Sequence, residues 1–136
     1  MIVIPLNSQV EIRVIEKFTH QLNSENTSNI ELIETYFLPT QNLDSTDREV
    51  FMAVVSEQLN LLRTKFSGCM QIEVVKHNED LQAIKSFNLQ HKDTANVYYI
   101  FCNRIILTPV LVKGDKLASI TVVSKTETGK KVFMTF

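Results

Sequence analysis

The β-rich runs in the last third of this 136-residue chain are separated by very short connections. The runs are residues 97–101, 105–112, 117–123 and 132–136. Polar segments of two, four and six residues join them, at 103–104, 113–116 and 125–130. Parallel strands need a crossover of roughly a dozen residues or more, so runs joined this tightly pair antiparallel. The last third therefore predicts a meander of four strands.

Helical periodicity dominates the first two-thirds of the chain. Apolar residues recur at helical spacing over about residues 9–22, where Ser8 and Glu11 have the spacing of a capping box and the polar face is expected to be solvated. A helix of about twenty residues is predicted to begin near Ser45 or Thr46. A third, short helix is expected after Asn78, whose side chain is a suitable cap.

Further strands are predicted before the meander. Residues 2–4 and 70–75 have strand patterns, the latter with apolar and polar side chains in alternation. Residues 30–38 are rich in β-branched and aromatic side chains, which favours a strand, although Ser28 and Glu31 would also cap a short helix. Pro109 cannot donate a ladder hydrogen bond, which indicates an edge position or a bulge in its strand.

These elements predict one α+β domain over residues 1–136. Its helices are expected on one face of a mixed, mostly antiparallel sheet that ends in the four-strand meander. The length of the chain is typical of a single domain, and 44% hydrophobic residues is an ordinary globular value.

Charge and cysteine content narrow the function classes. The net charge is −1, which makes nucleic acid an unfavoured partner, although five lysines lie near two hairpin tips. These are Lys113, Lys116, Lys125, Lys130 and Lys131. Cys69 and Cys102 show no metal-ligand or redox spacing, and the N-terminal apolar run is too short for a signal peptide. We therefore expect free, partly buried thiols in a cytoplasmic protein that does not cross a membrane.

Histidines and tyrosines provide the candidate ligand-binding residues. His20, His77 and His91 lie outside any metal-binding spacing, so no metal or other cofactor is expected. Glu73 and His77 share a strand side but are about 13 Å apart along an ideal strand, too far for contact. Folding could still place His91 or Tyr98 beside one of them as an acid–base pair. The residues expected to line a pocket, if one exists, are therefore Glu73, His77, His91, Tyr98 and Tyr99.

The run 97–101 is apolar on both alternations, so both faces of its strand need a cover. One face can meet the helices. The other would be covered by the curl of the sheet, a partner or a ligand. The terminal run adds Val132, Phe133, Met134 and Phe136, which could pair with a second copy of the chain as an apolar edge strand.

The absence of a catalytic signature favours a small non-catalytic interaction module, of accessory, inhibitor or immunity type. It would bind another protein or form a homodimer through its apolar sheet face or edge strand. The alternative is a binder or enzyme for an apolar small molecule, with a pocket between a curved sheet and the helices. A cavity lined by Tyr98 or Tyr99 would favour this alternative, whereas a packed interior supports only the interaction module.

Overall fold

The computed structural model describes residues 6–24, 26–39, 42–124 and 127–134. Its helices are α1 (Leu6–Leu22), α2 (Asn29–Tyr36), α3 (Ser45–Phe66) and α4 (Gln82–Phe87), with a 3-10 turn, η1, at Thr94–Asn96. Its strands are β1 (Ile72–Lys76), β2 (Val97–Cys102), β3 (Ile105–Lys113), β4 (Lys116–Ser119), β5 (Val122–Ser124) and β6 (Lys131–Phe133). The α+β fold class is confirmed. The strand predicted at residues 2–4 lies outside the described residues.

A four-stranded antiparallel sheet in the order β1-β2-β3-β4 forms the centre of the fold. The meander is therefore confirmed for β2, β3 and β4, while β5 and β6 pair as a separate hairpin. The predicted run 117–123 is interrupted at Ile120, whose side chain is buried in the core. The Thr108 hydroxyl lies within hydrogen-bonding distance of the Ile120 carbonyl, at 3.1 Å, where the chain leaves the sheet.

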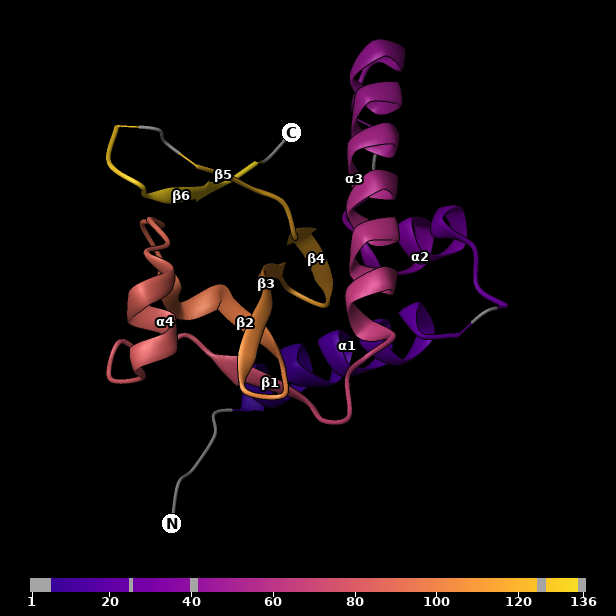
Figure 1. Cartoon of the computed structure of the whole chain (residues 1–136). Helices are drawn as coiled ribbons and strands as arrows, with labels where there is room; N and C mark the ends of the chain where they lie inside the picture. The colour runs from indigo at the N-terminus through magenta and orange to yellow at the C-terminus, as the bar shows by residue number, and fades with distance from the viewer. Residues whose placement is uncertain (1–5, 25, 40–41, 125–126, 135–136) are drawn as a thin grey trace.

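Both faces of the sheet are covered by other parts of the chain (Figure 1). Tyr98 and Ile100 of β2 pack against α1, α2 and α3 in the larger core cluster. Tyr99 and Phe101 point to the opposite face, where α4 and Phe133 of β6 complete a smaller cluster. The second apolar face of the run 97–101 is thus buried within the monomer. It is covered by α4 and β6, which the sequence had not assigned to that face.

The strand favoured for residues 30–38 is wrong, because this segment forms α2. The Ser28 hydroxyl accepts a hydrogen bond from the Glu31 amide at 3.2 Å, so the capping interaction is present. Leu32 and Ile33 bury one face of the helix, which offsets the weak helix propensity of its β-branched residues. Only Phe37 adopts a strand-like contact, as an isolated bridge to Leu117 of β4.

Two expectations for helix caps are also wrong. α1 begins at Leu6, so Ser8 lies inside its first turn and is not the cap. α4 begins at Gln82, and Leu81, not Asn78, occupies its cap position. α3 begins at Ser45, as expected, and its cap is Asp44, whose carboxylate accepts from the Asp47 amide at 2.7 Å. The polar face of α1 is not fully solvated either, because Ser8 and Glu11 are buried.

Pro109 lies in β3, an internal strand of the sheet, but at a position that has no neighbour in β4. The paired residues of β3 and β4 end at Leu111 and Ser119, so β4 does not extend as far as Pro109. The missing N–H therefore removes no bond to β4.

Candidate functional site

Tyr98 and Tyr99, which the sequence analysis assigned to one pocket, point to opposite faces of the sheet from neighbouring positions of β2. Tyr99 faces α4, and its hydroxyl shares a 2.8 Å hydrogen bond with Nδ1 of His77. The two rings lie 5.7 Å apart, tilted by 31°. Tyr99 has no exposed surface, and burial raises the pKa of its hydroxyl to about 12. The structure thus brings together His77, the residue that follows β1, and Tyr99 of β2.

The other candidate ligand-binding residues do not join this pair. Glu73 is exposed on β1, opposite Phe101 in the register, and His91 packs edge-on against the ring of Phe133 at 5.5 Å. Within the described part of the chain, neither His91 nor Tyr98 forms an acid–base pair with Glu73 or His77. The five residues are therefore distributed over several surroundings and do not form one site.

A surface groove of about 430 Å³ adjoins His77, with Glu79, Asp80, Lys85 and Asn88 among its lining residues. The His77 side chain is 10% exposed, and its Nε2 lies 3.9 Å from a carboxylate oxygen of Glu79. That nitrogen has no hydrogen-bond partner among the described residues and exposes less than 1 Å². A molecule in the groove would therefore meet charged side chains at its rim and not the imidazole nitrogen.

Tyr98 belongs to a buried polar network that the sequence did not reveal. Its hydroxyl donates to the Glu11 carboxylate at 3.1 Å, while Lys76 donates to the Ser8 hydroxyl at 2.7 Å. Burial is the main cause that raises the pKa of Tyr98, and the nearby Glu11 carboxylate adds to it, against a lowering contribution from Ser8.

A serine bonded to a lysine is a known arrangement for nucleophilic chemistry. Here Ser8 has no exposed surface and Glu11 is nearly buried, so a substrate cannot reach the hydroxyl. The network therefore fixes α1 on the sheet. No local signal in the sequence could have found it, since 68 residues separate Ser8 from Lys76 and 87 separate Glu11 from Tyr98.

The raised pKa of Tyr99 predicts a loss of stability at high pH. The unfolded tyrosine ionises near pH 10, whereas the folded one stays neutral to about pH 12, so the contribution is complete below pH 10 and is lost as pH rises through this window. We expect the free energy of unfolding to fall by about 2 kcal/mol between pH 10 and pH 12. Urea titrations at several pH values measure it. Tyr99→Phe should flatten the decline, and an equally steep decline in that variant would contradict the assignment.

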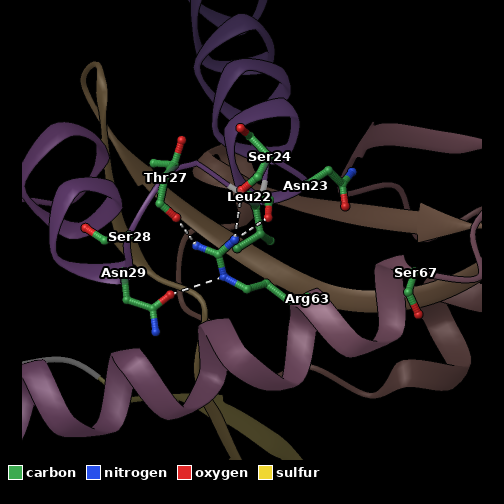
Figure 2. A pocket seen from close by; sticks show the side chains of 8 residues that line it. All are labelled: Leu22, Asn23, Ser24, Thr27, Ser28, Asn29, Arg63 and Ser67. Atoms are coloured by element: carbon green, nitrogen blue, oxygen red, sulfur yellow. Dashed lines mark hydrogen bonds between the residues drawn. The ribbon is translucent and has the colours of Figure 1, made fainter.

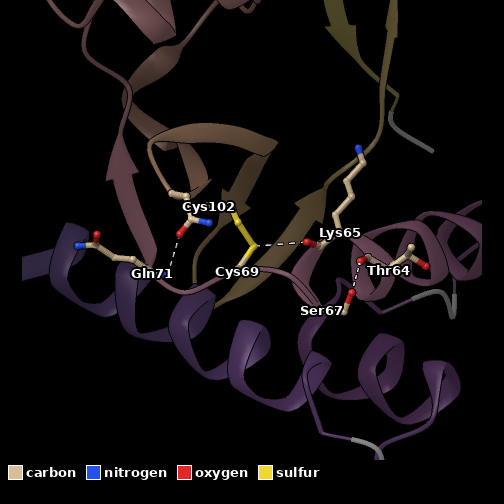
Figure 3. Close-up of a disulfide and its surroundings, with 7 residues drawn as sticks. Thr64, Lys65, Ser67, Cys69, Gln71 and Cys102 are labelled. Atoms are coloured by element: carbon tan, nitrogen blue, oxygen red, sulfur yellow. Dashed lines mark hydrogen bonds between the residues drawn. A yellow bond between two sulfur atoms is a disulfide. The ribbon is translucent and has the colours of Figure 1, made fainter.

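Cys69 and Cys102 form a disulfide, so the expectation of free thiols is wrong (Figure 3). Antiparallel pairing of β1 with β2 places Ile72 opposite Cys102, which brings Cys69 close to its partner. Their Cα atoms lie 5.5 Å apart, within the range that a disulfide spans. Cys69 Sγ also lies 3.4 Å from the Lys65 carbonyl, a contact to which a thiol could donate but a disulfide sulfur cannot.

Exposed apolar side chains gather around this disulfide. Ile72, Cys102 and Ile105 are paired in one row across β1, β2 and β3, so their side chains share one face of the sheet. Ile105 is 69% exposed, Ile72 36%, and Met70, the neighbour of Cys69, 93%. We call these three residues with the Cys69–Cys102 bond the disulfide end. Asn103 fastens it further, since its amide donates to the Gln71 carbonyl and its side-chain oxygen accepts from the Gln71 amide.

The turn at the disulfide end carries backbone strain. Asn103 and Arg104 connect β2 to β3 with positive φ values of 49° and 72°. Asparagine tolerates this conformation, but other residues that carry a Cβ atom adopt it at a cost of about 1–2 kcal/mol. Arg104→Gly should therefore raise the free energy of unfolding by about 1 kcal/mol in a urea titration. Arg104→Ala keeps the strain and should show no gain. Equal effects of the two substitutions would contradict this prediction.

A groove of about 580 Å³ lies at the loop between α1 and α2, and Arg63 of α3 occupies its centre (Figure 2). The guanidinium donates to the carbonyls of Leu22, Ser24 and Thr27, at 2.7, 3.4 and 2.8 Å. Its Nε donates to the side-chain oxygen of Asn29 at 3.2 Å. These bonds use most of the donors of the arginine, so its role is to hold the loop and not to bind a ligand.

The predicted interface residues lie mainly in the C-terminal hairpin. Val132 and Phe133 of β6 pair with β5, and both are half-buried, as is Met134. Phe133 packs into the smaller core cluster, while Phe136 lies outside the described residues. Of the lysines near the hairpin tips, Lys116 donates to the Thr35 carbonyl and Lys131 to the Phe87 carbonyl.

Within the described ranges, no group of three or more His, Cys, Asp or Glu side chains is placed to hold a metal ion. None of the described helices is long and apolar enough to cross a membrane. Comparison with protein-family models, with curated proteins and with solved structures finds no match to this chain.

Proposed function

We propose that this protein is a non-catalytic module that binds another protein through its disulfide end. The observation that carries the proposal is the gathering of Met70, Ile72 and Ile105 on a surface that a covalent bond holds in place. Apolar side chains exposed together favour a protein interface, and methionine is enriched in such interfaces. A rigid surface also loses little conformational entropy on binding.

The packing of the two tyrosines supports this proposal over a small-molecule pocket. Tyr98 and Tyr99 have no exposed surface and are absent from the linings of the grooves described above. Their hydroxyls are bonded to Glu11 and His77 inside the protein. A curved sheet around a ligand would instead present such side chains to a cavity.

The disulfide also changes the expected place of action. Structural disulfides persist in oxidising compartments and are rare where cellular thiols are kept reduced. We therefore propose that the protein acts in an oxidising environment, in place of the cytoplasm expected from the sequence.

Differential capture tests the proposed function. Purified protein, immobilised in its oxidised form, is incubated with extract of its source cells, and bound proteins are identified by mass spectrometry. We expect a partner that the wild type retains and that Ile105→Lys loses at least tenfold, because a charge would be buried at the interface. Val50→Lys is the matched control, since Val50 is 47% exposed near the start of α3, at the opposite end of that helix from Cys69.

Native mass spectrometry of the wild type completes the test. A dimer that Ile105→Lys dissociates would make a second copy of the chain the partner. A retained small-molecule mass, or a partner bound equally by both lysine variants, would overturn the proposal.

A further inference from the structure

The outer side of β1 is the most open edge in the described sheets. At the other side of the same sheet, Leu38 donates its amide to the Leu117 carbonyl and so covers β4. The free side of β6 is engaged at Lys131, which exchanges backbone hydrogen bonds with Asn88 and Gln90. β5 is only three residues long. β1 is longer, and among the described residues its only strand partner is β2.

The register defines which backbone groups of β1 point outward. The Asn103 amide donates to the Gln71 carbonyl, and the His77 amide donates to the Val97 carbonyl. Hydrogen-bonded pairs alternate along antiparallel strands, so residues 71, 73, 75 and 77 direct their backbone groups toward β2. The N–H and C=O groups of Ile72, Val74 and Lys76 therefore face the outer edge. No backbone partner of these outward groups is found in the described part of the chain.

A groove of about 230 Å³ runs between this edge and α1. The strand contributes Ile72 and Val74, while α1 contributes Glu16, Thr19 and His20, with Asn23 beyond its end. Val74 and Ile72 give the groove an apolar side, and the exposed carboxylate of Glu16 gives it an acidic one. An edge strand beside a helix is an arrangement that an extended peptide can enter as an additional strand.

We infer that β1 accepts an extended peptide segment of the partner protein as a fifth strand, within the groove along α1. Its backbone would bond to Ile72, Val74 and Lys76, with apolar side chains on alternate positions and a lysine or arginine beside Glu16. This inference rests on the proposed protein-binding function and names the form of the partner.

A second copy of the chain fits the groove less well. Its own β1 could bring only Lys76 to Glu16, and that ammonium already donates to Ser8 at 2.7 Å. Antiparallel pairing of two β1 strands would also bring the polar side of one α1 toward the other. The occupant is therefore a segment of a different protein.

Amide hydrogen exchange of the free protein provides the first test. We expect fast exchange at Ile72, Val74 and Lys76 and slow exchange at Glu73, Val75 and His77, because only the second set bonds to β2. Slow exchange at all six amides would show that the edge is already covered and would overturn the inference.

Selection of peptides identifies the occupant. A random dodecapeptide library is panned on the oxidised protein, and enriched peptides are synthesised for titration. We expect sequences with alternate apolar residues and one lysine or arginine, and protection of the Ile72, Val74 and Lys76 amides in the complex. Failure to enrich any sequence, or enrichment without this protection, would overturn the inference.

Two matched variants separate backbone pairing from side-chain packing. Ile72→Pro removes an outward N–H at the first residue of an edge strand, where proline is tolerated, whereas Ile72→Ala removes only the side chain. We expect Ile72→Pro to bind the selected peptide at least tenfold more weakly than Ile72→Ala. Glu16→Lys should weaken it several-fold through the basic residue of the peptide. Thermal unfolding confirms that each variant is folded.

The outcomes distinguish the two proposals. If Ile105→Lys abolishes binding of the selected peptides and Ile72→Pro leaves it unchanged, the disulfide end remains the binding surface and strand addition is eliminated. Native mass spectrometry showing a dimer that Ile72→Pro dissociates would make a second copy the occupant and overturn the choice of a different protein.

Discussion

Removal of the Cys69–Cys102 disulfide is expected to lower the free energy of unfolding by about 3.7 kcal/mol. The bond joins residues 33 positions apart, and the loss of loop-closure entropy in the unfolded chain gives this value. The enclosed segment contains β1, α4 and most of β2, which form one edge of the sheet and its smaller core. The expected loss is a large fraction of the stability of an ordinary domain.

Urea titrations of the wild type with and without a dithiol reductant measure this effect. The double variant Cys69→Ala/Cys102→Ala should match the reduced wild type and should not respond to the reductant. When the purified protein is denatured without a reductant, a thiol assay should find no free cysteine. Two free thiols, or equal stability in both redox states, would contradict the assignment and remove the basis for an oxidising environment.

Local patterns predicted the elements of this fold more accurately than their contacts. Alternation and short connections were sufficient for β2 and β3, and the apolar stripe of α3 is buried as periodicity predicts. The segment 30–38 shows the limit of such patterns. Its composition favoured a strand, but the Ser28 cap and the burial of Leu32 and Ile33 against the core stabilise a helix.

The candidate site depended on contacts that the sequence does not encode locally. His77 and Tyr99 became neighbours only through the register of β1 with β2, in which Tyr99 lies opposite Val75. The same register brought Cys69 to Cys102. The order and direction of strands therefore carried the information that residue types and spacings lacked.

Glu11 illustrates the same limit for buried charge. On a helical wheel its carboxylate belongs to the polar face of α1, which predicts solvation. In the fold it accepts from Tyr98 inside the core and is 6% exposed. A buried carboxylate of this kind requires a donor from another element, and no spacing rule identifies a donor 87 residues away.

Replacement of Arg63 is the second change with a large expected effect. Arg63→Met preserves the aliphatic part of the side chain but removes every donor from the loop between α1 and α2. The carbonyls of Leu22 and Thr27, with bonds of 2.7 and 2.8 Å, lose their charged partner. Hydrogen bonds to charged groups contribute about 1.5–3 kcal/mol each, and water partly replaces those at a half-buried position. We expect a loss of about 3 kcal/mol in the free energy of unfolding.

Two further variants show whether the planar fork of Arg63 is responsible. Arg63→Lys retains the charge but cannot reach three carbonyls and Asn29 together, so it should recover less than half of the loss. Arg13→Met, at an exposed position of α1, should change stability by less than about 0.5 kcal/mol. Urea titrations measure all three variants. Full recovery by lysine would show that charge alone holds the loop.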